Sequence, residues 1–230
     1  MRSRLVDPDL SQVINITAPD FRGGGEATIE LSSLAYHHDK TFDTFDLRTH
    51  SLDRNQAANL QLVFSGARNY AQDPSDWILL TGGYGCGKTH LAAAIANEYV
   101  HQGQSAIFVV VPDLLDHLRA TFSPVAQTSY DKRFEEIRNA PLLVLDDLGT
   151  QSATPWAQEK LYQLFNHRYN ARLPTIITMA DMTDLDPRLK SRLMDVGRCT
   201  AFAITAPSYR SSVSQQTQKR KPGRRRKSNY

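Results

Sequence analysis

The residues with the clearest chemical potential form a glycine-rich run from Thr81 to Thr89, which reads Thr-Gly-Gly-Tyr-Gly-Cys-Gly-Lys-Thr. Glycines let the backbone turn with successive N–H groups pointing inward, which makes a concave site for anions. Lys88 would add a positive charge at the β- and γ-phosphates of a nucleotide, and the Thr89 hydroxyl would add an oxygen ligand for Mg²⁺. The pattern therefore predicts a nucleoside triphosphate site, and the residues expected to contact the nucleotide are Gly82, Gly83, Tyr84, Gly85, Cys86, Gly87, Lys88, Thr89 and His90.

The segments on either side of this run place it in a suitable structural context. Residues 77–81 form an apolar stretch that predicts a buried strand, and Leu91, Ile95 and Tyr99 recur at the spacing of one helix face. Gly103 follows as a helix-ending residue. The run thus joins a strand to a helix N-terminus, whose dipole favours phosphate. The alternative, a glycine-rich turn followed by a chance Lys-Thr pair, does not account for that context.

Two adjacent aspartates, Asp146 and Asp147, directly follow the apolar stretch 141–145, which predicts another buried strand. In phosphate-loop ATPases a carboxylate at the end of such a strand supports Mg²⁺, and an adjacent acidic residue can orient the attacking water. We therefore expect Asp146 to hold Mg²⁺ together with Thr89, and Asp147 to activate the water. An aspartate pair could also simply begin a turn.

Apolar stretches alternate with helical patterns along the rest of the chain. Further strands are expected at 106–111, 174–179 and 199–204, and helices at 55–71, from 114, at 130–140, from 154 and from 186. Strands that alternate with helices favour an α/β fold with a doubly wound, mainly parallel sheet. We expect about five strands, with the nucleotide at their carboxyl ends.

The composition suits one main globular domain. The chain has 230 residues, 40% of them hydrophobic, and none of its stretches approaches the roughly 18 consecutive apolar residues that span a bilayer. Its first residues lack the apolar core of a signal peptide, so a cytoplasmic protein with no membrane partner is expected. Two cysteines, Cys86 and Cys199, are too few for a disulfide framework or a zinc site.

Positive charge is concentrated near the end of the chain. The net charge is +3, and residues 219–227 hold seven of the 27 basic residues and none of the 24 acidic ones. Such a run either binds nucleic acid through phosphate neutralisation or serves only as a solvated tail, and the sequence leaves both open. Residues 1–40 show no sustained hydrophobic periodicity, so we expect a flexible arm there. We expect a folded domain at 41–210 and a disordered basic tail at 211–230.

Several segments, taken in order, resemble one group of AAA+ ATPases, the bacterial replicative-helicase loaders of the DnaC/DnaI type and the related IstB transposition helpers. The resemblance extends over residues 41–210 and is carried by the segments 85–95, 142–149, 170–178, 186–195 and 206–210. It implies an AAA+ ATPase fold with little or no C-terminal lid and ATP and Mg²⁺ as cofactors. It also implies single-stranded DNA and a replicative helicase as partners, and a homo-oligomer when ATP is bound.

The same resemblance implies roles for two arginines. Arg192 resembles an arginine finger that reaches the γ-phosphate bound by a neighbouring subunit, and Arg210 resembles a sensor-2 arginine. Either could instead be a surface ion-pair partner. One position departs from the family pattern, because Ala180 stands where a polar sensor-1 residue, usually asparagine, is expected. Thr178 and Asp181 are the candidate substitutes.

These features favour an ATP-hydrolysing accessory protein of DNA replication that helps to load a replicative helicase on single-stranded DNA. A transposase-partner ATPase shares the same core, so the sequence separates these two interpretations poorly. A third interpretation is a module that binds ATP with weak or no hydrolysis, which Ala180 suggests. A metabolic phosphoryl-transferase is disfavoured by the paired aspartates and the Ser191-Arg192 motif.

Overall fold

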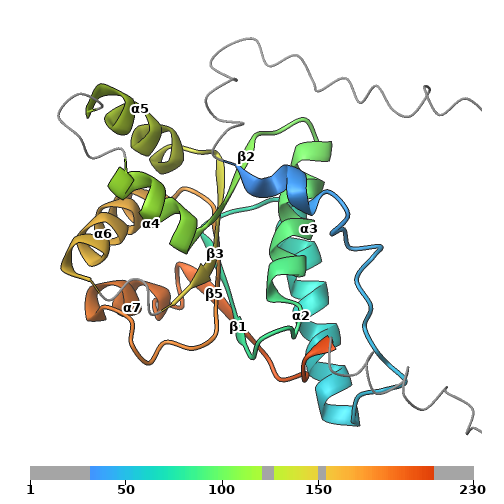
Figure 1. Ribbon diagram of the computed structural model, residues 1–230. Coiled ribbons are helices and arrows are strands. Elements are labelled where there is room, and N and C mark those ends of the chain that lie inside the picture. Colours follow the sequence, from blue (N-terminus) through green and yellow to red (C-terminus); the bar gives the residue numbers. More distant parts are fainter. Residues whose placement is uncertain (1–31, 121–126, 150–153, 210–230) are drawn as a thin grey trace, which may run out of the picture.

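A five-stranded sheet forms the centre of the molecule, and helices cover both of its faces (Figure 1). The computed structural model describes residues 32–120, 127–149 and 154–209. Neighbouring strands pair in parallel in the order β2-β3-β4-β1-β5. The strands are β1 (Trp77–Gly82), β2 (Ala106–Val110), β3 (Leu142–Leu148), β4 (Thr175–Met179) and β5 (Cys199–Ile204). The predicted doubly wound parallel sheet is confirmed.

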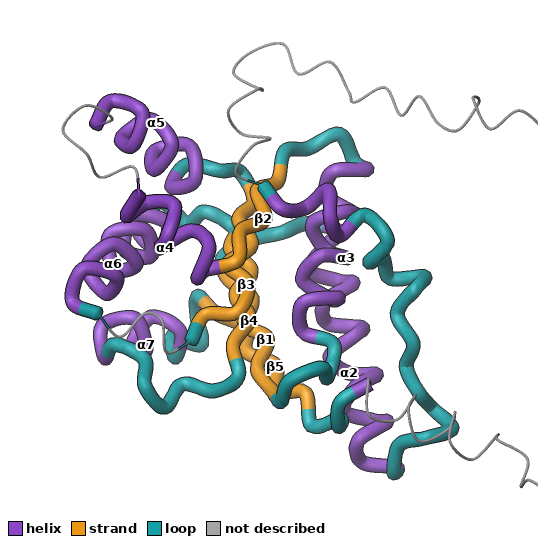
Figure 2. Tube along the Cα trace, viewed as in Figure 1, coloured by secondary structure: helices purple, strands orange, loops and turns teal. Residues whose placement is uncertain are grey.

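Two groups of helices enclose the sheet, which Figure 2 shows as a central layer between them. One face is covered by α2 (Arg54–Gln72) and α3 (Lys88–His101), and a short 3-10 helix, η2 (Ser33–His37), lies on the same side. The other face is covered by α4 (Val111–Ala120), α5 (Gln127–Arg138), α6 (Pro155–Asn170) and α7 (Pro187–Leu193). Because β1 to β4 are buried on both faces, they read in the sequence as mostly apolar runs.

The two sides of each strand contribute to two separate apolar cores. On β1, Ile78 and Leu80 pack with α2 and α3, whereas Trp77 and Leu79 pack with the helices of the other face. Side chains alternate with a period of two along a strand, so Thr178 of β4, which pairs with Leu80, points to the α3 side. Thr178 is thus a polar residue in the core between the sheet and α3, the helix that follows the glycine-rich loop.

Two expected helix starts are confirmed by capping hydrogen bonds. The side chains of Thr154 and Asp186 accept bonds from backbone N–H groups in the first turns of α6 and α7. Pro155 and Pro187 follow them, at positions where a missing N–H group has no helical partner to lose.

Side chains cover backbone groups at both outer edges of the sheet. At the β2 edge, the Ser32 hydroxyl accepts from the Phe108 N–H at 3.1 Å and the Ser33 hydroxyl donates to the Phe108 carbonyl at 3.2 Å. At the β5 edge, the Asn59 amide donates to the Ala203 carbonyl at 2.9 Å. Such bonds occupy groups that could otherwise pair with a strand of another chain.

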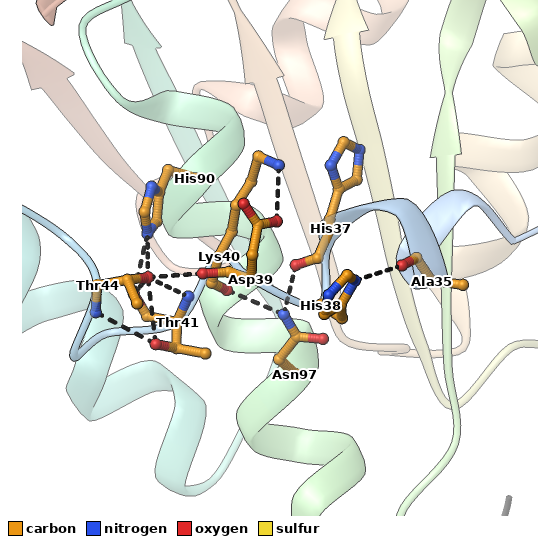
Figure 3. Close-up of polar contacts among 9 residues, drawn as sticks. All are labelled: Ala35, His37, His38, Asp39, Lys40, Thr41, Thr44, His90 and Asn97. Atoms are coloured by element: carbon orange, nitrogen blue, oxygen red, sulfur yellow. Dashed lines mark hydrogen bonds and ion pairs between the residues drawn. The ribbon is translucent and has the colours of Figure 1, made fainter. Parts of the chain in front are cut away.

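Residues 32–46 form an N-terminal strap along α3. The Asn97 side-chain amide of α3 donates to the carbonyls of His37 and Lys40, both at 2.9 Å (Figure 3). Phe42 of the strap is buried in the core on this side of the sheet. The described end of the expected arm is therefore docked on the core, and we propose that the folded unit begins at or before residue 32.

Candidate nucleotide-binding site

Glycines shape the loop between β1 and α3. Gly82, Gly85 and Gly87 have φ angles of 141°, 74° and 116°, a region that other residues adopt only with strain. Space is also limited. A Cβ atom on Gly85 would lie 2.5 Å from the Ser208 hydroxyl oxygen, and one on Gly87 would lie 2.9 Å from the Phe45 ring. The glycines of the sequence motif therefore stand where the backbone requires them.

Lys88 begins α3 and turns back over the loop. Its Nζ donates to the carbonyls of Gly82 and Gly83, at 2.7 and 2.9 Å, and the side chain is buried. Gly87 caps α3 without a side-chain hydrogen bond, so N–H groups of the first turn remain for an anion. A cation held by carbonyls beside a helix N-terminus is a suitable arrangement for phosphate.

Three polar side chains meet beside the loop. The Thr89 hydroxyl lies 3.0 and 3.1 Å from the two carboxylate oxygens of Asp146, and the Thr178 hydroxyl donates to Asp146 Oδ1 at 2.7 Å. Asp146 is 5% exposed, and its burial raises the pKa of the carboxyl, although the two hydroxyl donors partly oppose that rise. These contacts join α3, β3 and β4 at the carboxyl ends of the strands.

A β-bulge separates the two aspartates. The pairing of β3 with β4 shifts register between Leu145 and Leu148, where β3 carries one extra residue. Within this bulge Asp147 has a φ of 58°, and its N–H donates to the Thr178 hydroxyl at 3.0 Å. The bulge leaves Asp146 buried and Asp147 exposed, as bulges next to functional sites commonly redirect side chains.

Asp147 lines a hollow of about 140 Å³ next to the loop. Tyr84 of the loop also lines it, together with residues 179–181 and 184–185. The Tyr84 ring is 81% exposed, and its centroid lies 5.9 Å from Lys88 Nζ. Asp147 therefore borders a space that reaches the phosphate loop. Its role in orienting water stays a prediction.

The donor set fits Mg²⁺, which prefers oxygen ligands and usually keeps one or two protein ligands, waters and nucleotide phosphates. Thr89 and Asp146 supply a hydroxyl and a carboxylate that already touch. The hydrogen-bond donors to this buried carboxylate are hydroxyls, so a bound cation would offset the cost of burying it. The described residues contain no cluster of three or more His, Cys, Asp or Glu ligands.

The structure separates the two substitutes that the sequence suggested for the residue missing at position 180. Ala180 contributes only its backbone carbonyl, which accepts a hydrogen bond from the Gly82 N–H at 3.2 Å. The Asp181 carboxylate accepts from the Thr183 N–H at 2.8 Å, within its own turn. Thr178, in contrast, contacts Asp146 directly. The signal for it was a threonine between the apolar residues Ile177 and Met179 of a predicted strand.

Two residues expected to contact the nucleotide, Cys86 and His90, contact the protein in this structure. Cys86 is buried, and His90 Nε2 lies 2.9 Å from the Thr41 carbonyl and 3.3 Å from the Thr44 hydroxyl (Figure 3). The His90 ring also meets the Phe45 ring edge-on. His90 thus connects the first turn of α3 to the N-terminal strap, and a nucleotide contact by either residue stays a prediction.

Arg192 lies on α7, outside this group of side chains. Its guanidinium donates to the Arg188 carbonyl at 2.8 Å and to Asn166 Oδ1 at 2.6 Å, and its carbon lies 5.0 Å from the centroid of the Tyr162 ring. These bonds are to α6 and α7 rather than to the loop, and action on a neighbouring subunit stays a prediction. Arg210, the other predicted arginine, lies outside the described residues.

The C-terminal part of the described chain returns to the loop. The Tyr209 N–H donates to the Gly85 carbonyl at 2.9 Å, and Arg48 donates to the Pro207 carbonyl at 2.7 Å. Tyr209 therefore lies beside the glycine-rich loop between β1 and α3.

The chain resembles known ATP-binding and replication proteins. A model of the family of IstB-like ATP binding proteins matches residues 24–217. The replicative helicase loader DnaC of Escherichia coli K12 is 31% identical over 159 residues, which are 66% of this chain and 64% of that protein. The replicative helicase loader DnaI of Bacillus subtilis is 28% identical over 140 residues, which are 60% of this chain and 43% of that protein. A crystal structure of DnaI has a TM-score of 0.59 at 24% identity and covers 75% of this chain and 92% of the other.

The chain spans less than two thirds of the length of either curated relative. The likeness to the DnaI structure, at 24% identity, shows a shared fold. Separately, none of the helices in the described ranges has the length and apolar character needed to cross a membrane.

Proposed function

Because the chain belongs to the family of IstB-like ATP binding proteins, we propose that it is an Mg²⁺-dependent ATPase that helps to load a replicative helicase on single-stranded DNA. The observation that carries this proposal is the meeting of Lys88, Thr89 and Asp146 at one glycine-rich loop. A lysine, a hydroxyl and a buried carboxylate at this spacing serve nucleoside triphosphates and Mg²⁺ in phosphate-loop proteins.

In this proposal the loop binds ATP through Lys88 and through backbone N–H groups at the start of α3. Lys88 exchanges the carbonyls of Gly82 and Gly83 for the β- and γ-phosphates, and the free N–H groups of α3 receive phosphate oxygens. Thr89 and Asp146 hold Mg²⁺. When bound, the ion neutralises phosphate charge and favours transfer of the γ-phosphoryl group.

Hydrolysis requires two further residues. Asp147 borders the hollow beside the loop, where it would orient the attacking water. Arg192 would act on the nucleotide of a second copy of the chain, so ATP would promote a homo-oligomer. The support for this role is that no carboxylate among the described residues pairs with the Arg192 guanidinium.

A direct test is ATP hydrolysis as a function of protein concentration, with Mg²⁺ present or removed by a chelator. The proposal requires hydrolysis per subunit to rise with concentration and to need Mg²⁺. Tight ATP binding with no turnover at any concentration would support the alternative, a binding module, for which the apolar side chain of Ala180 is the specific observation.

The partner is proposed from the names of the relatives, which are replicative helicase loaders. The alternative partner is a transposase, because the matching family model is the IstB-like one and covers more of the chain. Pull-down from the source cytosol with tagged protein, with and without a non-hydrolysable ATP analogue, distinguishes them. Recovery of a hexameric helicase supports the first proposal, and recovery of a transposase supports the second.

Binding to single-stranded DNA is proposed through the basic residues at 219–227, which lie outside the described residues. Seven cationic side chains in this run can release counterions from phosphates. Deletion of 219–230 should therefore weaken DNA binding and flatten its dependence on salt, with ATP binding unchanged. An unchanged salt slope would assign the run to solvation only.

A further inference from the structure

Thr178 is a fully buried hydroxyl residue on the strand at the centre of the sheet. β4 lies between β1, which leads into the phosphate loop, and β3, which ends in the two aspartates. The residues on either side of Thr178 along the strand, Ile177 and Met179, are apolar and buried. A hydroxyl in such a layer lowers stability unless it is hydrogen-bonded, so its partners are informative.

This hydroxyl donates one hydrogen bond and accepts another, both with the aspartate pair. It donates to Asp146 Oδ1 at 2.7 Å and accepts from the Asp147 N–H at 3.0 Å. A hydroxyl has a single proton, so donating to one residue and accepting from the next fixes its direction. Thr178 thereby ties the side chain of Asp146 to the backbone of Asp147 across the bulge.

The first bond bears on the metal ligand. Asp146 receives donors from Thr89 and Thr178, and Thr89 is itself an expected Mg²⁺ ligand. A Thr89 hydroxyl that binds the ion changes its own partners, whereas Thr178 stands within a strand and keeps its place. Thr178 is then the donor that holds the carboxylate toward α3.

The second bond bears on the water-orienting residue. Asp147 has a φ of 58°, which a non-glycine residue adopts at some cost. Its N–H bond to Thr178 helps to keep this conformation, in which the residue lines the hollow beside Tyr84. Loss of the hydroxyl would leave this N–H without its acceptor.

We propose that Thr178 is a positioning residue that sets Asp146 for the metal and Asp147 for the water, and so performs on β4 the task of the polar side chain absent at Ala180. The inference rests on the proposed ATPase function and deepens it. Thr178 acts through the two aspartates rather than on the nucleotide. Partners that orient metal ligands in this way typically contribute about 10- to 100-fold to metal affinity or activity.

Three variants test this role. Thr178→Val keeps the shape and removes the hydroxyl, Thr178→Ser keeps the hydroxyl, and Ile176→Val is a control that removes one methylene from the same side of the same strand. The measurements are ADP affinity with and without Mg²⁺ by calorimetry, kcat and KM for ATP, and hydrogen exchange at the Asp147 amide in nucleotide-free protein.

For Thr178→Val we expect a loss of about tenfold or more in ADP affinity with Mg²⁺ and in kcat, with Mg²⁺-free ADP affinity unchanged. The Asp147 amide should exchange faster. Thr178→Ser should restore each quantity to within about threefold of wild type, and Ile176→Val should leave them unchanged apart from a small loss of stability.

Two results would overturn the inference. One is a Thr178→Val protein with wild-type Mg²⁺ dependence and kcat, and the other is equal losses in Thr178→Val and Ile176→Val, which would indicate a general disturbance of the strand. Failure of the proposed function is distinguishable, because the wild-type protein itself would then neither hydrolyse ATP nor bind ADP more tightly with Mg²⁺.

Discussion

The positively charged side chains of the glycine-rich loop and of α7 have different kinds of hydrogen-bond and ion-pair partners. Lys88 in the loop is held by two backbone carbonyls. On α7, Arg188 is paired with Asp186 at 3.0 Å and with Glu159 at 3.7 Å, whereas Arg192 is held by a carbonyl and an amide oxygen. Two cations of this set, Lys88 and Arg192, therefore have no carboxylate partner among the described residues.

Whether the partner is a carboxylate or a neutral oxygen distinguishes cations that form structural ion pairs from cations that can bind an anion. A paired arginine contributes to an ion-pair network and has little charge left for a ligand. A cation held by neutral oxygens keeps its charge, and its bonds can be exchanged for phosphate oxygens. By this criterion Lys88 is available to a phosphate group at its own loop, and we propose that Arg192 is available to the nucleotide of a neighbouring copy.

The largest effect is expected from Arg192→Ala. Its ATP affinity should equal that of wild type, because the residue lies outside the loop, but hydrolysis should fall by about 10³-fold, since an arginine finger contributes 10³ to 10⁵ in rate. Arg188→Ala is the matched control, because the side chain removed is one whose charge is already paired. Its hydrolysis should stay near the wild-type rate.

Mixing distinguishes action on a neighbour from a folding defect. A mixture of Arg192→Ala and Asp147→Asn proteins should recover part of the activity, because some interfaces then join an intact aspartate site to an intact arginine. A mixture that co-assembles but remains as inactive as its components would assign Arg192 to a structural role.

Lys88→Ala tests the other unpaired cation and should lower ATP affinity by about 10²-fold, because the phosphates lose the charge that faces them. Lys40→Ala, which removes an ammonium paired with Asp39 at 3.2 Å, is the control and should bind ATP normally. Calorimetry gives both affinities. Equal affinities for wild type and Lys88→Ala would show that the loop is not the phosphate site.

Asp147→Asn is expected to retain ATP binding and to slow hydrolysis by about tenfold, because it changes water activation more than phosphate contacts. Asp184→Asn is a control that removes a carboxylate from the same hollow. Similar slowing in both variants would point to the overall charge of the hollow rather than to a specific role of Asp147.

Local patterns in the sequence predicted most of the fold and the first half of the site. The glycine-rich run, the apolar strands and the caps at Thr154 and Asp186 are encoded by neighbouring residues, and the structure confirms them. The bulge at the aspartate pair was not predicted, because a one-residue shift between β3 and β4 depends on the pairing of distant strands.

Long-range contacts account for the other features that the sequence did not reveal. Arg168 is fully buried within α6, donates to carbonyls that include Ala140 and Pro174, and has its pKa lowered by burial to about 9. A charged residue in a helix pattern reads as exposed unless those distant carbonyls are known. The packing of Phe45 over Gly87 likewise joins segments that only the fold brings together.

The smallest effect concerns stability and compares the two adjacent aspartates. Burial raises the pKa of the Asp146 carboxyl above its ordinary value, so the folded protein holds this proton more tightly than the unfolded chain does. The ionised carboxylate therefore lowers stability at pH values above the raised pKa. That loss begins to shrink as the pH falls through the raised pKa and the folded state takes up the proton, and it is gone below the ordinary pKa, where the unfolded chain is protonated as well.

Asp146→Asn should accordingly raise the melting temperature of the protein free of nucleotide and Mg²⁺ at neutral pH. A rise of about 2–4 °C is the change that 1 kcal/mol produces in a chain of this length. The advantage over wild type should shrink as the pH is lowered, and Mg²⁺ with ADP should stabilise the variant less than wild type, because the metal requires the ionised carboxylate. Asp147→Asn, at an exposed position, should change the melting temperature little. If Asp146→Asn melted lower than wild type at neutral pH, the buried carboxylate would be a stabilising group, and the argument that its burial is offset by a bound cation would be wrong.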